Sequence, residues 1–297
     1  MNKTAMITIM GRPNVGKSTL VNALTGDKVS IVSPKPQTTR NRIYGVFKHG
    51  ETQMILLDTP GFHKPRTQLG DLMVGIAKES VADVDAVVLM VEPIDNIGTL
   101  EEQMIEHIKV SGVPAVLVIN KIDTIKVDLA LPVIEKYSQR FGFDAIVPVS
   151  AKKGSGMTEL LNVFEKYAVE GPQLFPDGMN TDQPEKQIIA EIIREKLLIC
   201  LDDELPHGIA VEITKFSERG EDEIIDVDAT IYCEKSNHKG MIIGKQGAML
   251  KRVGQLARED IEHFMGTKVF LQTWVKVKEN WRDSRIMMKN LGFTKCI

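Results

Sequence analysis

Cysteine, aromatic residues and long apolar runs are all scarce in this sequence. Three of its 297 residues are cysteine and none has Cys-x-x-Cys spacing, which argues against a disulfide framework or a cysteine-bound metal. The longest apolar runs, such as Ala86–Val91, are too short to span a bilayer. A single early charge, Lys3, precedes the first apolar segment, so we expect no signal peptide. These absences favour a protein of the reducing cytoplasm.

The chain as a whole also lacks a strong net charge, but its C-terminal part consists of an acidic segment followed by a basic one. The formal net charge is −3. Residues 185–234 carry 5 basic and 14 acidic side chains, a net charge of −9, whereas residues 235–297 carry 13 basic and 5 acidic ones, a net charge of +8. The basic segment predicts contact with a polyanion, and a solvated charged surface is the alternative.

The length predicts about two domains at roughly 150 residues each. Up to residue 170, apolar strand-like segments alternate with helix-period segments, which is typical of an α/β fold around a buried, mostly parallel sheet. The short turn at Gly50 predicts one antiparallel hairpin. Expected strands cover residues 6–10, 43–48, 53–57, 86–91, 115–119 and 145–149, and expected helices cover 16–25, 69–81, 99–111, 129–141 and 157–168. We expect residues 1–170 to form this domain, 171–184 a linker rich in Pro, Gly, Asp and Asn, and 185–297 a second domain.

The phosphate-binding motif is GRPNVGKS, Gly11 to Ser18, between the first apolar segment and the first helical one. It fits G-x-x-x-x-G-K-[ST] in the strand–loop–helix context that the motif requires. Its glycines let backbone N–H groups surround phosphates, and the helix N-terminus adds a positive dipole end. We expect Lys17 to reach the β- and γ-phosphates and Ser18 to bind Mg²⁺.

Three further motifs follow strands and narrow the nucleotide. DTPG (Asp58–Gly61) supplies a Mg²⁺-binding carboxylate and a γ-phosphate-binding N–H, NKID (Asn120–Asp123) a carboxylate for guanine, and SAK (Ser150–Lys152) backbone N–H groups at the base. Adenine lacks the N1–H and 2-amino group that Asp123 would bind, so the sequence predicts a P-loop GTPase domain. The expected GTP-binding residues are Gly11, Arg12, Pro13, Asn14, Val15, Gly16, Lys17, Ser18, Thr19, Asp58, Thr59, Pro60, Gly61, Asn120, Lys121, Asp123, Ser150, Ala151 and Lys152.

The switch segment, residues 33–42 (SPKPQTTRNR), should be ordered by GTP and released by GDP. We expect Thr39 to bind Mg²⁺ together with Ser18 and Asp58, with Thr38 as the alternative. The expected catalytic residues are Lys17, Thr39 and Gly61. Where small GTPases orient water with glutamine, this chain has Phe62, which cannot polarise water, so another group or a partner must act. His63, which follows, is more readily an exposed switch residue than a catalytic one.

The second domain shows the order α-β-β-α-α-β-α, with a Gly-x-x-G turn, Gly244–Gly247 (GKQG), between two helical segments. Such a turn lets backbone approach nucleotides, and its place in a basic segment favours a type II KH-like RNA-binding domain of α+β fold over a plain helical corner. Trp281 either stacks on a base or anchors the last helix, and Trp274 is more readily a cover for the sheet. The expected RNA-binding residues are Gly244, Lys245, Gln246, Gly247, Lys251, Arg252, Trp281, Arg282 and Arg285.

With GRPNVGKS, QTTR, DTPGF, NKID and SAK followed by IIGKQG, the chain resembles the bacterial Era family of GTPases over nearly its whole length. The resemblance implies binding of 16S ribosomal RNA near its 3′ end, a role in 30S ribosomal subunit assembly, and some peripheral association with the inner face of the cell membrane. It also implies that Asn14 acts as a catalytic residue by binding K⁺, although Asn14 as a simple turn residue is equally open. We expect slow hydrolysis and a monomer.

Two other functions remain open at this stage. Nucleotide occupancy could merely fix the orientation of a non-catalytic RNA-binding protein. Alternatively, the second domain could target a membrane or a protein partner in place of RNA. Binding of GTP over ATP, and loss of RNA binding on changing the GKQG turn, would separate these alternatives.

Overall fold

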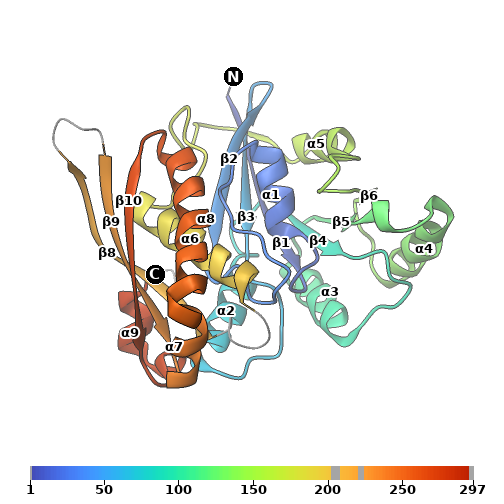
Figure 1. The fold of residues 1–297 in the computed structure, drawn as a ribbon. Coiled ribbons are helices and arrows are strands. Elements are labelled where there is room, and N and C mark those ends of the chain that lie inside the picture. The colour runs from blue at the N-terminus through green and yellow to red at the C-terminus, as the bar shows by residue number, and fades with distance from the viewer. Residues whose placement is uncertain (1, 202–207, 220–223, 294–297) are drawn as a thin grey trace.

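The computed structural model describes residues 2–201, 208–219 and 224–293. These residues form two units, each built around its own sheet and core (Figure 1). Among the described residues, no helix combines the length and the apolar character needed to cross a membrane.

The first unit has a seven-stranded sheet in the order β2-β3-β1-β4-β5-β6, with β7 paired to β1. The hairpin partner β2 runs antiparallel to β3, and β1, β3, β4, β5 and β6 pair in parallel, as the apolar segments predicted. The short β7 was not predicted, because two residues carry no periodicity; it pairs antiparallel with the start of β1. The strands are β1 (Lys3–Gly11), β2 (Ile43–His49), β3 (Thr52–Asp58), β4 (Ala86–Val91), β5 (Ala115–Ile119), β6 (Ala145–Pro148) and β7 (Val169–Glu170).

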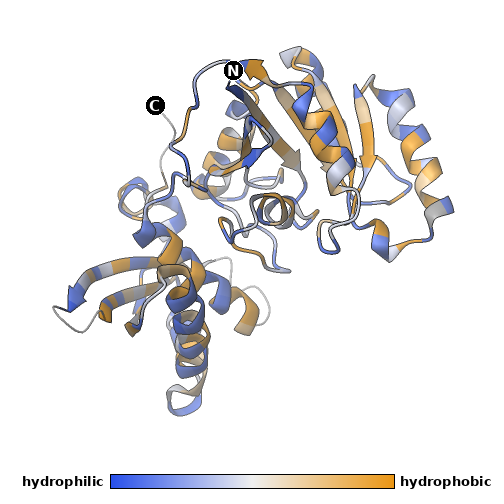
Figure 2. Cartoon of the chain, turned by 90° about the horizontal axis from the view of Figure 1, so that it is seen from above, coloured by the Kyte–Doolittle hydropathy of each residue, from blue (hydrophilic) through white to orange (hydrophobic). Residues whose placement is uncertain are grey.

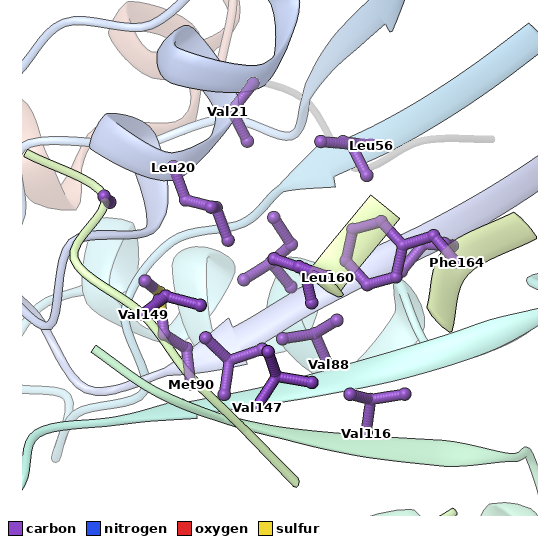
Figure 3. Close-up of a cluster of buried hydrophobic side chains, with 14 of the residues drawn as sticks. Leu20, Val21, Leu56, Val88, Met90, Val116, Val147, Val149, Leu160 and Phe164 are labelled. Atoms are coloured by element: carbon purple, nitrogen blue, oxygen red, sulfur yellow. The ribbon is translucent and has the colours of Figure 1, made fainter. Parts of the chain in front are cut away.

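Helices cover both faces of this sheet, as a parallel sheet requires. One core lies between the sheet and α1 and α5, where Leu20 and Phe164 meet strand residues such as Val88 (Figure 3). A second core, on the other face, takes side chains from α2, α3 and α4. Figure 2 shows that this larger sheet is built mainly of hydrophobic residues. The helices are α1 (Lys17–Thr25), α2 (Gln68–Glu79), α3 (Thr99–Ser111), α4 (Ala130–Arg140) and α5 (Met157–Glu165), with 3₁₀ helices η1 (Ile122–Thr124) and η2 (Val127–Leu129).

The segment 171–184 forms no helix or strand, but it is bound to the first unit along β2 and β3. The Gln53 side chain, which is buried, donates to the carbonyl of Phe175 and accepts from the N–H groups of Leu174 and Phe175. Val46 N–H donates to Asn180 O at 2.8 Å. The linker is therefore held against the edge of the sheet by backbone-directed hydrogen bonds.

The second unit has a three-stranded sheet in the order β10-β9-β8, with β9 parallel to β10 and antiparallel to β8. Helices α6 and α8 pack against one face of this sheet and share its core. The observed order is the predicted α-β-β-α-α-β-α. The strand β8 continues to Arg219. The elements are α6 (Glu185–Cys200), β8 (Ala210–Arg219), β9 (Ile224–Cys233), α7 (Ser236–Ile243), η5 (Lys245–Gly247), α8 (Ala248–Met265), β10 (Val269–Val277), η6 (Trp281–Asp283) and α9 (Arg285–Asn290).

The two units meet through an apolar cluster and through polar contacts to the switch segment. Leu69 and Met73 of α2 pack in one cluster with Trp281, Met288 and Phe293. In Figure 1, α6 lies between the small sheet and the first unit. The second unit is thus placed directly against the parts of the first that surround the phosphate-binding loop.

Candidate nucleotide-binding site and RNA-facing turn

The phosphate-binding loop closes tightly because two of its glycines leave no room for a side chain. Gly16 has φ +105°, and a Cβ there would lie 2.2 Å from Asn120 Nδ2. A Cβ on Gly11 would lie 2.5 Å from the carbonyl oxygen of Met90. Any larger residue would therefore push the loop off the strand ends that hold it.

Lys17 is buried inside this loop. Its Nζ donates to the carbonyls of Gly11 at 3.2 Å and Arg12 at 3.0 Å. Burial lowers the pKa of the Lys17 ammonium to about 8, and the nearby Asp58 charge opposes that shift. A buried ammonium held only by carbonyls is short of negative charge, and a bound phosphate would supply it.

The three residues predicted to bind Mg²⁺ meet at one point. Ser18 Oγ lies 2.7 Å from Asp58 Oδ2 and 2.9 Å from Thr39 Oγ1, and Thr39 Oγ1 lies 3.3 Å from the same carboxylate oxygen. The other carboxylate oxygen, Asp58 Oδ1, is buried without a hydrogen-bond partner. Two hydroxyls and an under-satisfied carboxylate are hard oxygen donors that suit Mg²⁺, with phosphate and water completing the shell. Thr38, the alternative, instead contacts Ser33 and Lys35.

The residues that follow Asp58 place no glutamine after the DTPG motif, since Phe62 occupies that position. A Cβ on Gly61 would lie 2.6 Å from Pro13 N, so Gly61 lies directly against the phosphate-binding loop. Phe62 is buried in the core between the sheet and α2 to α4. His63 is half-buried, not exposed as expected, and its Nδ1 lies 2.8 Å from the Gly61 carbonyl.

The predicted base-binding motifs brace one another at the far end of the pocket. Asn120 donates to Val15 O at 2.7 Å and accepts from Ala151 N–H at 2.9 Å, which ties NKID and SAK to the phosphate-binding loop. Ser150 Oγ donates to Asp123 Oδ1 at 2.6 Å, and this hydrogen bond lowers the pKa of Asp123. Asp123 is therefore held as an exposed carboxylate. The Ala151 N–H, expected at the base, braces Asn120 instead.

A cavity of about 700 Å³ joins the phosphate end to the base end. Several predicted GTP-binding residues do not line this cavity, because they are buried or are paired with other residues. They support the residues that do line it. Arg12 is one of the supporting residues: its guanidinium pairs with Glu101 of α3. Thr59 donates to Ile9 O at 2.7 Å. The predicted residues that line the cavity are Pro13, Asn14, Gly16, Lys17, Ser18, Thr19, Thr39, Gly61, Asn120, Lys121, Asp123 and Lys152.

Apart from Thr38, the alternative Mg²⁺ ligand, the remaining lining residues were not predicted as ligand contacts. Most belong to the switch segment or directly precede it, and their position in sequence could have suggested them. Ile199 could not be found that way, because it comes from α6 of the second unit and no motif contains it. These residues are Ile31, Val32, Ser33, Pro34, Gln37, Thr38, Thr124 and Ile199.

The GKQG turn has a backbone that requires its first glycine. Gly244 has φ +73°, and a Cβ there would lie 2.7 Å from Met249 Cβ. Gly247 also has positive φ, +79°, but has open space around it. Gln246 adopts φ 50°. Lys245, Gln246, Lys251 and Arg252 are exposed, so the structure brings cations and a projecting backbone turn to one end of α8.

Trp281 does not have the exposure that base stacking needs, which corrects its inclusion among the RNA-binding residues. It is fully buried, and its Nε1 donates to Gly208 O at 2.9 Å. Its ring also stacks on Phe293 with centroids 6.2 Å apart. Trp281 therefore anchors the C-terminal segment. Trp274, interpreted as a cover, is 44% exposed on β10.

Arg282 and Arg285, the two predicted cations that follow Trp281, differ in environment. Arg282 is half-buried and pairs with Glu234, so part of its charge is already compensated. Arg285 is exposed at the start of α9. Of these two predicted contacts, Arg285 is the one whose side chain is open to a polyanion.

Comparison with known proteins matches both units. A family model described as a 50S ribosome-binding GTPase covers residues 6–121, and a KH domain model covers residues 204–282. GTPase Era of Ruminiclostridium cellulolyticum is 52% identical over 98% of this chain and 97% of its own. The chain belongs to the Era family of GTPases. GTPase Era of Clostridioides difficile is 48% identical over 99% of both chains.

Solved Era structures have the same arrangement of both domains. Era in complex with MgGDPNP and nucleotides 1506–1542 of 16S ribosomal RNA has a TM-score of 0.96 and 38% identity, covering 99% of this chain and 100% of that one. An Aquifex aeolicus Era variant bound to GDP·AlF4− has a TM-score of 0.95 and 38% identity, with the same coverage. The P-loop GTPase and KH folds predicted from sequence are thereby confirmed for this Era-family protein.

Proposed function

We propose that this GTPase uses its nucleotide state to time a contact with 16S ribosomal RNA near the 3′ end, as part of 30S subunit assembly. The observation that carries the proposal is the attachment of the switch segment to the KH domain. Arg194 of α6 donates to Thr38 O, and Arg40 Nη1 donates to Ile209 O at 2.7 Å. Thr39, the expected Mg²⁺ ligand, lies between these two anchors. The solved Era complex with 16S RNA supports the choice of RNA.

Mg²⁺ is the proposed cofactor, held by Ser18, Thr39 and Asp58. When bound, it would neutralise charge that develops on the β- and γ-phosphates. The chain's own residues bind and orient: Lys17 holds the phosphates and the Gly61 N–H meets the γ-phosphate. Because the buried Phe62 offers the attacking water no polar atom, we propose that unassisted hydrolysis is slow.

A potassium ion is the proposed second cofactor, bound through Asn14. Asn14 has φ 65°, and its Nδ2 donates to the Pro34 carbonyl at 2.7 Å in the switch segment. Carbonyl and amide oxygens are suitable K⁺ ligands, so both groups could contribute. Turnover measured in KCl and in NaCl tests this proposal. Equal rates in the two salts would remove it.

The proposed RNA contact uses the GKQG turn and the cations of α8, with Arg285 added from α9. Crosslinking followed by sequencing of bound RNA, with GTP and then with GDP, tests the partner and its nucleotide dependence together. We expect crosslinks near the 3′ end of 16S RNA that differ between the two nucleotides. Crosslinks scattered over unrelated RNA would contradict the proposal. The alternative, a membrane or protein partner, predicts no specific RNA crosslink.

A matched pair of glycine variants identifies the binding element. Gly247→Asp adds a carboxylate to the turn without a steric clash and should abolish RNA binding while leaving basal GTP hydrolysis intact. Gly112→Asp is the control, because Gly112 ends α3 with a similar φ of +68° and equally open space. Gly244 is unsuitable, since a side chain there would displace Met249 and distort the turn itself. RNA affinity that survives in Gly247→Asp would argue against the KH contact.

The location and oligomeric state remain proposals. We propose a monomer in the cytoplasm that associates peripherally with the inner face of the membrane. Sedimentation of the purified chain and fractionation of cells test the two points separately.

A further inference from the structure

One residue that lines the nucleotide cavity belongs to the other domain. Ile199, near the end of α6, is the single lining residue that the described KH domain contributes. Its side chain is 51% exposed, whereas residues 187–198 of the same helix are all buried or half-buried. An isolated exposed isoleucine on an otherwise covered helix is a surface that a bound ligand can cover.

Ile199 is held in place by contacts of the preceding helical turn with the first domain. Glu195, four residues earlier and so on the same helix face, accepts from Val32 N–H at 2.9 Å and pairs with Lys28. Arg194 binds the carbonyl of Thr38. Val32 and Thr38 both line the cavity, so α6 is attached to the cavity wall at two points.

The chemistry along the cavity leaves one part of the nucleotide for this apolar wall. Lys17 and Ser18 stand at the phosphate end, and Asp123 at the base end. Val32, which is 38% exposed, and Ile199 are the cavity's two large aliphatic side chains with an open surface. Neither side chain can bind phosphate or the polar edge of guanine. Both can pack against the C–H groups of the ribose, which lies between the phosphates and the base.

We propose that Ile199 is a nucleotide-binding residue that packs on the ribose of bound guanine nucleotide. The KH domain then forms part of the GTP site itself. By thermodynamic linkage, nucleotide binding and docking of α6 on the first domain stabilise each other equally. The inference rests on guanine nucleotide occupying this cavity, which titration of the unmodified chain with GDP measures independently.

Titration of full-length Ile199→Ala with GDP and GTP tests the contact. We expect both dissociation constants to rise about fivefold, as loss of a partly covered aliphatic side chain implies. Ile286→Ala is the matched control: Ile286 is also in the second domain, is 75% exposed on α9 and does not line the cavity. Thermal melts without nucleotide should be alike for both variants, because each side chain is at least half exposed. Unchanged nucleotide affinity in Ile199→Ala would overturn the proposal.

A ribose-modified nucleotide tests the assignment to the sugar. GDP carrying a methylanthraniloyl group on the 2′- or 3′-oxygen places bulk where Ile199 is proposed to lie. The ratio of its dissociation constant to that of GDP should fall at least about threefold in Ile199→Ala, because the substitution makes room for the group. An unchanged ratio would show that Ile199 contacts another part of the ligand, and the ribose assignment would be wrong.

Discussion

Lys28, just after α1 of the GTPase domain, lies 2.7 Å from Asp260 on α8 of the KH domain. The same ammonium lies 2.5 Å from Glu195 on α6. Because α8 begins at the GKQG turn and α6 borders the nucleotide cavity, one side chain joins the helices that carry both sites. This arrangement connects the nucleotide cavity, through one side chain, to the helix that begins at the proposed RNA contact.

Replacing Lys28 should weaken the coupling between nucleotide and RNA. In Lys28→Ala, the ratio of RNA affinities with GTP and with GDP should move toward one by about two- to fivefold, because a partly exposed ion pair carries on the order of 1 kcal/mol or less. Fluorescence anisotropy with an RNA from the 3′ end of 16S ribosomal RNA measures the RNA affinity with each nucleotide. Lys136→Ala, which removes the surface pair with Asp95 in the GTPase domain, is the control. The same ratio in Lys28→Ala and wild type would exclude this route.

The two tryptophans should respond very differently to truncation. Trp281→Ala removes a fully buried ring and its hydrogen bond to Gly208, and should lower the free energy of unfolding by about 3–5 kcal/mol. Trp274→Ala removes a 44% exposed ring and should cost less than about 1 kcal/mol. Urea denaturation followed by circular dichroism compares them directly. Equal losses would contradict the anchoring role of Trp281.

Nucleotide affinity should fall as the pH rises past the Lys17 pKa of about 8. Free protein then loses the proton that phosphates would stabilise, so the GDP dissociation constant should rise about tenfold between pH 7 and pH 9. Stability of the unliganded protein should change the other way. Between about 8 and the ordinary value of 10.5, the unfolded chain binds more protons at Lys17, so this group's contribution to stability rises with pH.

A Lys17→Arg variant separates this titration from others. Arginine keeps its charge throughout this range, so whatever its affinity, the pH dependence between 7 and 9 should flatten. Calorimetric titration at several pH values measures both proteins. A slope that persists in Lys17→Arg would assign the effect to another group.

Guanine selectivity should depend on the Asp123 carboxylate. Asp123→Asn replaces one carboxylate oxygen with an NH2 donor that opposes the 2-amino donor of guanine, and should weaken GDP binding by about a hundredfold. Xanthosine diphosphate, which presents an oxygen in place of the 2-amino group, should gain affinity. Ser150→Ala is the control, since it removes the 2.6 Å hydrogen bond to Asp123 and the hydrogen bond from Lys153 N–H but keeps the Asp123 carboxylate, and should produce no gain for xanthosine. Competition titrations of GDP against xanthosine diphosphate measure this selectivity in both variants and in the unmodified protein.

The fold was predictable because local chemistry and periodicity agreed with the tertiary structure. β4 and β5 occupy the predicted residues 86–91 and 115–119. Short continuous runs of Val, Ile and Leu between helical segments are typical of parallel strands that are buried on both faces. The short β7 was missed, because pairing with the start of β1 created it.

The sequence alone was enough to predict which motifs form the nucleotide-binding site. Each is a short run whose glycines, lysine, hydroxyl or carboxylate must follow a strand end at fixed spacing, so adjacency along the chain already places the groups within reach of one phosphate or base. The GKQG turn belongs to the same class, because two helical segments and a basic composition surround it in sequence.

Only the tertiary structure decided the relations between segments far apart in the chain. It chose Thr39 over Thr38 by placing its hydroxyl beside Ser18 and Asp58, and it buried Trp281 against α2. It also brought Ile199 to the nucleotide cavity. Such contacts depend on how two separate cores pack together, and no local period or spacing records the geometry of that packing.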